Sequence, residues 1–441
     1  MPTVIELSAN ATSVDCPVET ETSPLRTTRP LARVLGFLKS FILIAPLAFL
    51  LVAFLTSLVG GALKYGGPAN SKLDSDFAMF YTAAQVSQAH GNLYNPPLLL
   101  RNETRLMRQQ HIRMTVLPVL VRVGNPQIFF WAIGPLTRLP YRLAGWLWFG
   151  LMALATIIGA LVAMRIAGWE LRLVPLLLFL SMPVTVMGYY VGNVISLVFM
   201  GLMLGLLAAR RYPVLSGALM AVAWLKPSVS FPLVMLIVLF HVKDRRSVLA
   251  GLVLATIALA TLTLVVLGSG SFVEWVVGLS RYSRDIASQV EIAPLSGLYV
   301  GWTSPTVRTI LEAASIAVAL SLTVWWWVRN DGEQTSFART GWLWFAWFLA
   351  TPYAHGNDVV LLTVPILVML GRDACHIMRF PAAPAIYLLF VTEAIFPFRV
   401  GPEALLLTTV CCIIACRKWP ETVNSSRVER VESAAPSLAS A

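Results

Sequence analysis

Charged residues are scarce in this sequence, which excludes a soluble globular protein. Asp, Glu, Lys and Arg make up 12% of its 441 residues, whereas soluble domains carry roughly 25%. Hydrophobic residues account for 57%, and the mean hydropathy is +0.73. Apolar runs recur with about the 20 residues that a helix needs to cross a bilayer. We therefore expect an all-α polytopic membrane protein, because an open sheet in lipid would leave backbone groups unpaired.

Several signatures of soluble enzymes are also missing. The five cysteines form neither a disulfide framework nor a metal-binding spacing. No glycine-rich phosphate loop is present, and no Ser or Cys has a recognisable base partner. These absences argue against soluble-type nucleotide chemistry, and we expect neither a metal site nor a cofactor.

The two ends of the chain differ in composition from its middle. Residues 1–33 and 420–441 are rich in small polar residues and Glu, and we expect both to be disordered cytoplasmic tails around a transmembrane domain at 34–419. The apolar run Phe41–Leu63 is a full span, unlike the short core of a signal peptide, and is expected to be an uncleaved anchor.

About twelve transmembrane helices are predicted from the apolar runs. After the first span, a long outer loop is expected at 64–142 and a second at 269–305. The remaining spans are expected near 143–164, 172–188, 191–209, 213–225, 228–241, 247–268, 306–328, 340–351, 358–371, 381–396 and 402–416.

The charges of the short loops predict which side of the membrane each loop faces. With a cytoplasmic N-terminus, the short outer loops hold only Lys226 and Arg399. The short inner loops hold the other basic residues considered, namely Arg165, Arg172, Arg210, Arg211, Lys243, Arg245, Arg246, Arg329, Arg339, Arg372 and Arg379. This bias accounts for much of the net charge of +11 without a nucleic-acid partner.

The segment Asn125–Leu139 is apolar but shorter than a span. Counted as a crossing, it would reverse every later loop and place Lys226 and His355 on the side opposite Asp76. We therefore interpret it as an interfacial or re-entrant part of the first outer loop.

With that topology, polar residues collect on the outer side of the membrane. They are Asp74, Asp76, Tyr189, Tyr190, Asn193, Lys226, His355, Asn357, Asp358, Glu274, Arg281, Arg284, Asp285 and Glu291. Several have simpler explanations. Asp76 suits a helix start, Lys226 could snorkel, His355 could cap a helix, and the tyrosines, Asn193 and the arginines could contact lipid headgroups. Against the snorkelling alternative, Pro227 breaks the apolar stretch after Lys226 and can open a polar pocket.

A carboxylate facing cations at the outer surface suits transfer from a phosphate-linked lipid donor. The carboxylate would accept the proton of an attacking hydroxyl, and the cations would stabilise the donor phosphate. A transporter or flippase of a lipid-linked substrate is the alternative, although no internal repeat is visible. A structural membrane subunit is a third possibility.

Four segments resemble glycosyltransferase family 87 in order and spacing, over roughly residues 70 to 370. They are SDFAMFYTAA with GNLYNPP, YYVGNVISLVFMGLMLGLLAARR, GALMAVAWLKPSVSFPLVMLIVLF and ATPYAHGNDVVLLTVPIL. The resemblance implies a GT-C fold and an inverting, metal-independent enzyme of a bacterial inner membrane. Its active site would face outward, and it would transfer a hexose, with mannose expected, from a polyprenyl-phosphate donor to an envelope lipid or glycan acceptor.

The resemblance also implies roles for individual residues. Asp76 matches the general base, with Asp74 as the alternative, and Lys226 and His355 match positions around the donor phosphate and sugar. The other expected donor-binding residues are Asn357, Tyr190, Asn193, Arg281 and Arg284. The sequence departs from the family pattern at Gly192–Asn193–Val194 and at Asn125–Pro126–Gln127.

Overall fold

The computed structural model describes residues 76–110, 123–169, 192–286, 295–299 and 303–370, with a few isolated positions elsewhere. All of them belong to one compact unit, Leu50–Ala441. The regular elements in this part of the chain are helices. The expected tails and the spans at 41–63 and 381–396 lie outside the described residues, as do most of the predicted spans at 172–188 and 402–416.

Two groups of helices make up the described fold. The first, here called the loop module, is formed by α2 (Asp76–Gln88), α3 (Pro96–Gln109), α4 (Gln127–Ala132) and the 3₁₀ helix η3 (Gly134–Arg138). The second, the helix bundle, is formed by α5 (Tyr141–Ile166), α8 (Ile195–Ala208), α9 (Pro213–Met220), η4 (Ala221–Leu225), α10 (Pro227–Phe240), α11 (Arg245–Leu267), α14 (Pro305–Arg329), α15 (Phe337–Ala350), η5 (Gly356–Leu362) and α16 (Thr363–Leu370). Two further helices, α12 (Gly270–Ile286) and α13 (Ser296–Tyr299), come from the second long loop.

Three helices of the described part, α5, α11 and α14, are long and apolar enough to cross a membrane. Four shorter apolar helical segments accompany them, at Ile195–Ala208, Pro213–Leu225, Pro227–Phe240 and Gly356–Val368. Many large apolar side chains of α11 and α14 are exposed, as expected for helices in contact with lipid tails. The helical membrane architecture is therefore confirmed, whereas the count of about twelve spans is not.

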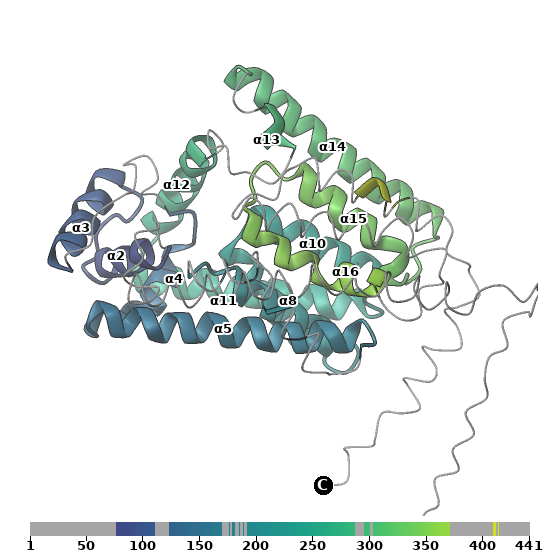
Figure 1. Cartoon of the computed structure of the whole chain (residues 1–441), viewed down its shortest axis with the longest axis horizontal. Coiled ribbons are helices and arrows are strands. Elements are labelled where there is room, and N and C mark those ends of the chain that lie inside the picture. The colour runs from purple at the N-terminus through teal and green to yellow at the C-terminus, as the bar shows by residue number, and fades with distance from the viewer. Residues whose placement is uncertain are drawn as a thin grey trace, which may run out of the picture. The chain divides into compact units, whose positions relative to one another are not determined.

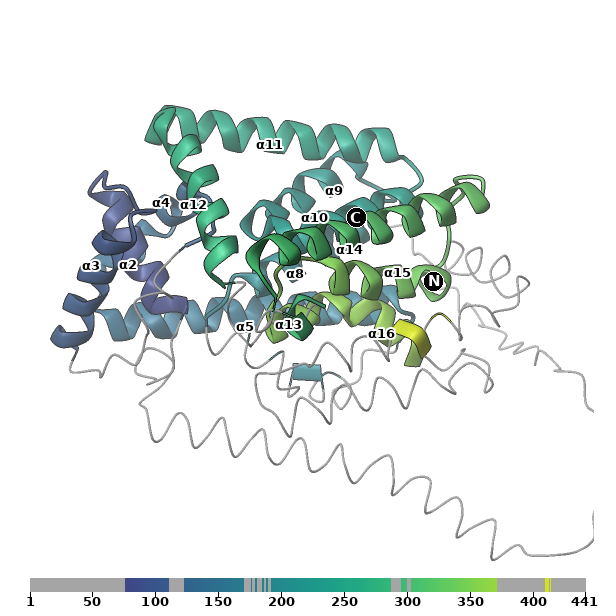
Figure 2. The same ribbon diagram turned by 90° about the horizontal axis from the view of Figure 1, so that it is seen from above.

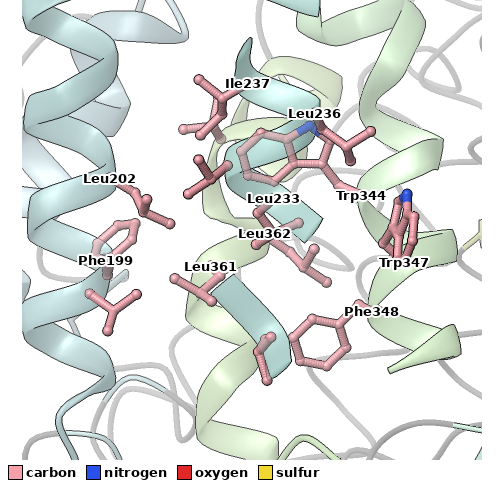
Figure 3. Packing of buried hydrophobic residues seen from close by; sticks show 14 of the residues in the cluster. Phe199, Leu202, Leu233, Leu236, Ile237, Trp344, Trp347, Phe348, Leu361 and Leu362 are labelled. Atoms are coloured by element: carbon pink, nitrogen blue, oxygen red, sulfur yellow. The ribbon is translucent and has the colours of Figure 1, made fainter. Parts of the chain in front are cut away.

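The helix bundle is held together by a large apolar core. In Figure 2, α5 and α11 lie on opposite sides of α8, α9 and α10, and α8 packs against both α5 and α9. Figure 3 shows Phe199 and Leu202 of α8 on one side, facing Leu233 of α10 and Phe348 of α15 on the other. Close packing is the main force between helices in lipid, because apolar side chains gain little from leaving lipid tails.

The loop module packs on one end of α5, and both views show α2, α3 and α4 gathered there (Figures 1 and 2). The ring of Phe77 stacks on Tyr141 at 5.6 Å and on Trp148 at 6.2 Å between centroids. The Tyr81 hydroxyl donates to the Leu139 carbonyl oxygen at 2.9 Å. Aromatic packing thus fixes the start of α2 against the transmembrane helix.

The segment Asn125–Leu139 is confirmed as too short to cross the membrane. It contains α4, of six residues, and η3, of five residues. At about 1.5 to 2.0 Å per residue, neither helix approaches the roughly 30 Å of a hydrocarbon core.

The chain between α10 and α15 shows that successive loops alternate between two ends of the bundle. The backbone N–H of Thr335 donates to the Phe240 carbonyl at 2.9 Å, which joins the ends of two basic loops. At the opposite end, the Thr351 hydroxyl donates to the Ser228 carbonyl at 3.0 Å. Lys226 and His355 therefore share one end, as the predicted alternation of the loops requires.

Candidate active site

Asp76 is the first residue of α2 and is partly buried. Its Oδ2 accepts a hydrogen bond from Asn193 Nδ2 at 2.6 Å. The Oδ1 of Asn193 accepts in turn from the backbone N–H of Ile195 at 2.9 Å, so both polar atoms of the amide are engaged. Asn193 therefore fixes the orientation of the Asp76 carboxylate. The predicted helix-start position of Asp76 is also confirmed.

The turn that carries Asn193 depends on Gly192. Gly192 has φ of +80°, a conformation that residues with a side chain rarely adopt. Trp148 Nε1 donates to the Gly192 carbonyl at 2.8 Å. A Cβ at Gly192 would lie 3.0 Å from the Trp148 ring and 3.1 Å from Phe77. The departure from the family pattern at Gly192–Asn193 thus provides the partner of Asp76.

Lys226 lies at a break between two helices, as predicted from Pro227. η4 ends at Leu225 and α10 begins at Pro227, so Lys226 occupies a non-helical position between them. Its Nζ forms an ion pair with Asp358 Oδ1. Lys226 is 8% exposed and Asp358 is fully buried. The snorkelling explanation for Lys226 is therefore wrong, because its ammonium turns into the protein.

His355 caps η5, so the capping explanation is confirmed. Its side chain accepts from the Asp358 backbone, and Asp358 Oδ2 accepts from the His355 N–H at 2.9 Å. The two oxygens of Asp358 therefore bind Lys226 and the His355 backbone separately. The neighbouring Asn357 is 2% exposed, and its Oδ1 lacks a partner within the described part of the chain.

Two tyrosines join the Asp76 side of the site to the Lys226 side. The hydroxyls of Tyr282 and Tyr353 are hydrogen-bonded at 2.7 Å. Lys226 Nζ lies 5.9 Å from the centre of the Tyr353 ring, and the His355 ring lies 4.9 Å from it. Burial raises the pKa of Tyr282, the hydrogen bond with Tyr353 lowers it, and the charges of Asp76 and Asp358 raise it further. The charges of both carboxylates therefore act on the tyrosine pair.

The second departure from the family pattern, Asn125–Pro126–Gln127, also makes a connection to the site. Asn125 Nδ2 donates to the carbonyl of Leu225 at 2.6 Å, directly before Lys226. The Tyr94 hydroxyl donates to the Asn125 carbonyl at 2.8 Å. Asn125 thus ties the loop module to the helix break that positions Lys226.

The arginines of α12 do not join this cluster in the same way. Arg281 is exposed and lines a cavity of about 10 Å³ with Leu93, Tyr94 and Val123. That volume holds about one water molecule. Arg284 is in α12, but its side chain is not among those described, and Asp74 and Tyr190 lie outside the described residues.

Sequence reasoning placed Asp358 among the outer polar residues but did not assign it to the site, and it missed both tyrosines. The spacing His355-x-x-Asp358 is that of a capping box, which could have identified the carboxylate as a partner of the histidine backbone. Tyr353 is two residues from His355 in the same motif. Tyr282 has no motif around it, and only the packing of α12 reveals it.

Comparison with known proteins supports one family. No curated protein and no solved structure matches the chain. The model of glycosyltransferase family 87 matches residues 125–352, just over half of the chain. The match is shorter than the expected 70 to 370 and leaves out Asp76, His355 and Asp358. It includes Lys226, Asn193 and Tyr282, and with the helical membrane fold it shows that the chain is a membrane glycosyltransferase that belongs to glycosyltransferase family 87.

Proposed function

We propose that this protein transfers a hexose, mannose, from a polyprenyl-phosphate donor to a lipid or glycan acceptor, with Asp76 as the general base. The observation that supports the proposal is the Lys226–Asp358 ion pair beside the Tyr353 ring, because Tyr282, the hydrogen-bonded partner of Tyr353, also experiences the charge of Asp76. A base and a cation positioned close together are what transfer from a phosphate-linked sugar requires.

In the proposed reaction, the Asp76 carboxylate accepts the proton of the acceptor hydroxyl. The acceptor oxygen then bonds to the anomeric carbon, and the bond from that carbon to the phosphate oxygen breaks. Polyprenyl phosphate leaves with the bonding electrons, and the configuration at the anomeric carbon inverts. Asn193 would hold the carboxylate toward the acceptor, because it binds one oxygen at 2.6 Å.

Lys226 would stabilise the negative charge of the leaving phosphate. An ammonium group has three N–H donors, and among the described residues Asp358 accepts one of them, which leaves two to donate to phosphate oxygens. Asp358 also keeps the buried ammonium in place when no donor is bound. Because Lys226 supplies the positive charge at the phosphate, we propose that transfer is metal-independent, and EDTA should leave its rate unchanged.

The site would open on the extracytoplasmic face of a bacterial inner membrane. The basic loops that contain Arg245 and Arg339 lie at the end of the bundle opposite Lys226. Basic loops remain on the cytoplasmic side, which leaves the outer face for the site. A lipid-linked sugar is available there, whereas a nucleotide sugar ordinarily is not.

The test uses the purified full-length chain in lipid nanodiscs, radiolabelled polyprenyl-phosphate mannose and a glycolipid extract as acceptor. We expect labelled glycolipid from the wild type and from Asp331→Asn, and none above background from Asp76→Asn. Asp331 is an exposed carboxylate with φ of +49°, a conformation that Asn tolerates. The control variant therefore makes the same chemical change outside the site.

The same preparation in sealed vesicles distinguishes transfer from transport. Movement of labelled lipid between leaflets without labelled glycolipid would contradict the proposal and favour a flippase. Equal transfer by the wild type and Asp76→Asn would exclude Asp76 as the base and leave the transferase assignment intact.

A further inference from the structure

The helix α12 contacts the rest of the protein through one face. Trp275, Gly278 and Tyr282 are spaced at i, i+3 and i+7, which places them on one side of a helix. Trp275 Nε1 donates to the Gly124 carbonyl at 3.0 Å, and a Cβ at Gly278 would lie 2.5 Å from the Tyr94 ring. This face therefore packs closely on the loop module.

The same face brings Tyr282 to the active site. A Cβ at Gly124 would lie 3.1 Å from the Tyr282 ring, so the ring packs directly on this glycine and a side chain there would displace it slightly. The ring meets Tyr353 edge to face, with centroids 5.4 Å apart and planes at 85°. The hydroxyl of Tyr282 is thus held against the hydroxyl of Tyr353 by packing on two sides.

The two phenols remain neutral beside the carboxylates. Burial raises the pKa of Tyr353, and the charge of Asp358, the hydrogen bond with Tyr282 and the charge of Asp76 act in the same direction. The phenols together carry two O–H donors, of which their mutual hydrogen bond uses one. In the part of the chain that is described, neither phenol makes another hydrogen bond. One O–H donor and several lone pairs thus remain for a ligand.

The position of the phenol pair decides which ligand group suits it. The proposed phosphate-binding ammonium lies 5.9 Å from the Tyr353 ring, the charge of the proposed base acts on both phenols, and the hexose ring must lie near both groups during transfer. Two neighbouring carboxylates disfavour an anion at the phenols. A sugar hydroxyl is neutral and both donates and accepts, so it matches the one donor and the lone pairs that the phenols offer.

We propose that Tyr282 and Tyr353 bind a hydroxyl of the donor hexose and so contribute to recognition of the sugar. This inference rests on the proposed function. It assigns to α12 a direct role in the site, whereas the donor-binding residues expected there from the sequence were Arg281 and Arg284.

Tyr282→Phe tests the proposal because it removes one oxygen and keeps the ring that packs on Gly124. We expect the KM for polyprenyl-phosphate mannose to rise five- to tenfold, the size of one neutral hydrogen bond. The inhibition constant of sugar-free polyprenyl phosphate should stay within twofold. Tyr353→Phe should raise the KM by a similar factor. The double variant should raise the KM by less than the product of the two single increases, because the two residues are in contact. Tyr212→Phe, at an exposed position on the basic side, should change neither constant.

The outcomes separate this inference from the proposed function. An unchanged KM in both Tyr282→Phe and Tyr353→Phe, with an active wild type, would overturn the sugar contact alone. An equal rise in the inhibition constant of polyprenyl phosphate would also overturn it, because the hydroxyl would then act on the phosphate or the lipid. A wild type that binds polyprenyl phosphate but transfers no mannose would contradict the proposed function and the sugar contact together.

Discussion

The loop module and the helix bundle each supply one carboxylate to the site, and they hold it differently. Asp76 from the loop module is partly buried and is bonded to a neutral amide. Asp358 from the bundle is fully buried, paired with Lys226 and bonded to the His355 backbone. A general base must be within reach of the acceptor hydroxyl, which a partly exposed carboxylate allows and a fully buried, ion-paired one does not. The contrast favours Asp76 for chemistry and Asp358 for positioning.

The largest effect is expected for Asp76→Asn. The amide keeps the shape of the carboxylate but does not accept the acceptor proton, so the transfer rate should fall by about a hundredfold to ten-thousandfold. The measurement is single-turnover transfer of labelled mannose, together with binding of the donor. A thermal midpoint equal to that of the wild type would show that the loss is chemical. A rate within threefold of the wild type would reverse the contrast between the two carboxylates.

Asp358→Leu should instead affect the stability of the bundle. It leaves the ammonium of Lys226 buried without its partner, which costs on the order of 3 kcal/mol. The matched variant Lys226→Met/Asp358→Leu removes both charges and should recover most of that loss. Denaturant titration of the purified proteins measures the free energy of unfolding of the single and the double variant. We expect the double variant to remain inactive, because Lys226 is gone, and equal stability of the single and double variants would show that the pair is not coupled.

Much of the bundle could be predicted because its signals are local. Pro227 predicted the break after Lys226, and α15 (Phe337–Ala350) lies within a few residues of the span expected at 340–351. The short segment Asn125–Leu139 was recognised by its length alone. In each case the evidence is contained in a window of about 20 residues.

The partners within the site could not be predicted, because they depend on contacts distant in sequence. Asn193 is 117 residues from Asp76, Asp358 is 132 residues from Lys226, and Tyr353 is 71 residues from Tyr282. Hydropathy and loop charge determine which end of a helix a residue occupies, but not its rotation about the helix axis. That rotation is decided by packing. The sequence therefore predicted a shared end for Asp76 and Lys226, and the structure adds the pairings.

Gly192→Ala should disturb the contact between the loop module and the bundle by an intermediate amount. Its positive φ costs an alanine about 1 kcal/mol, and a Cβ 3.0 Å from Trp148 adds to that cost. Gly168→Ala is the control, because Gly168 has φ of +73° and no atom within 4 Å of an added Cβ. We expect Gly192→Ala to lower the free energy of unfolding by about 2 kcal/mol and Gly168→Ala to lower it by about 1 kcal/mol. Thermal or denaturant unfolding measures both values.

The displaced turn should also loosen Asn193 from Asp76, so Gly192→Ala should lower the transfer rate while Gly168→Ala leaves it unchanged. Equal losses of stability at the two glycines would show that the backbone conformation, and not the packing on Trp148, limits this position. The loop module would then be held less tightly than its aromatic contacts suggest.

The smallest effect is expected at the far end of the helix bundle, where His241 follows α10. Its Nδ1 lies 3.0 Å from the Thr335 carbonyl, and its ring stacks on Phe337 at 3.6 Å. Burial lowers the pKa of His241 to about 3, although the hydrogen bond to Thr335 acts in the opposite direction. The folded pKa is therefore below the unfolded value of about 6.5. The unfolded state binds more protons as the pH falls, so this contribution to stability is complete above pH 6.5 and is lost below it.

Between pH 7 and pH 5.5, protonation of His241 in the unfolded state lowers the free energy of unfolding by about 1.3 kcal/mol. His241→Gln should therefore be less stable than the wild type at pH 7 but lose about 1 kcal/mol less on acidification, as measured by unfolding at both pH values. His90→Asn is the control, because His90 is exposed and its φ of +53° suits Asn. An acid loss in His241→Gln equal to that of the wild type would show that His241 is already protonated in the fold. The basic end of the bundle would then carry a buried charge, as the site end does at Lys226.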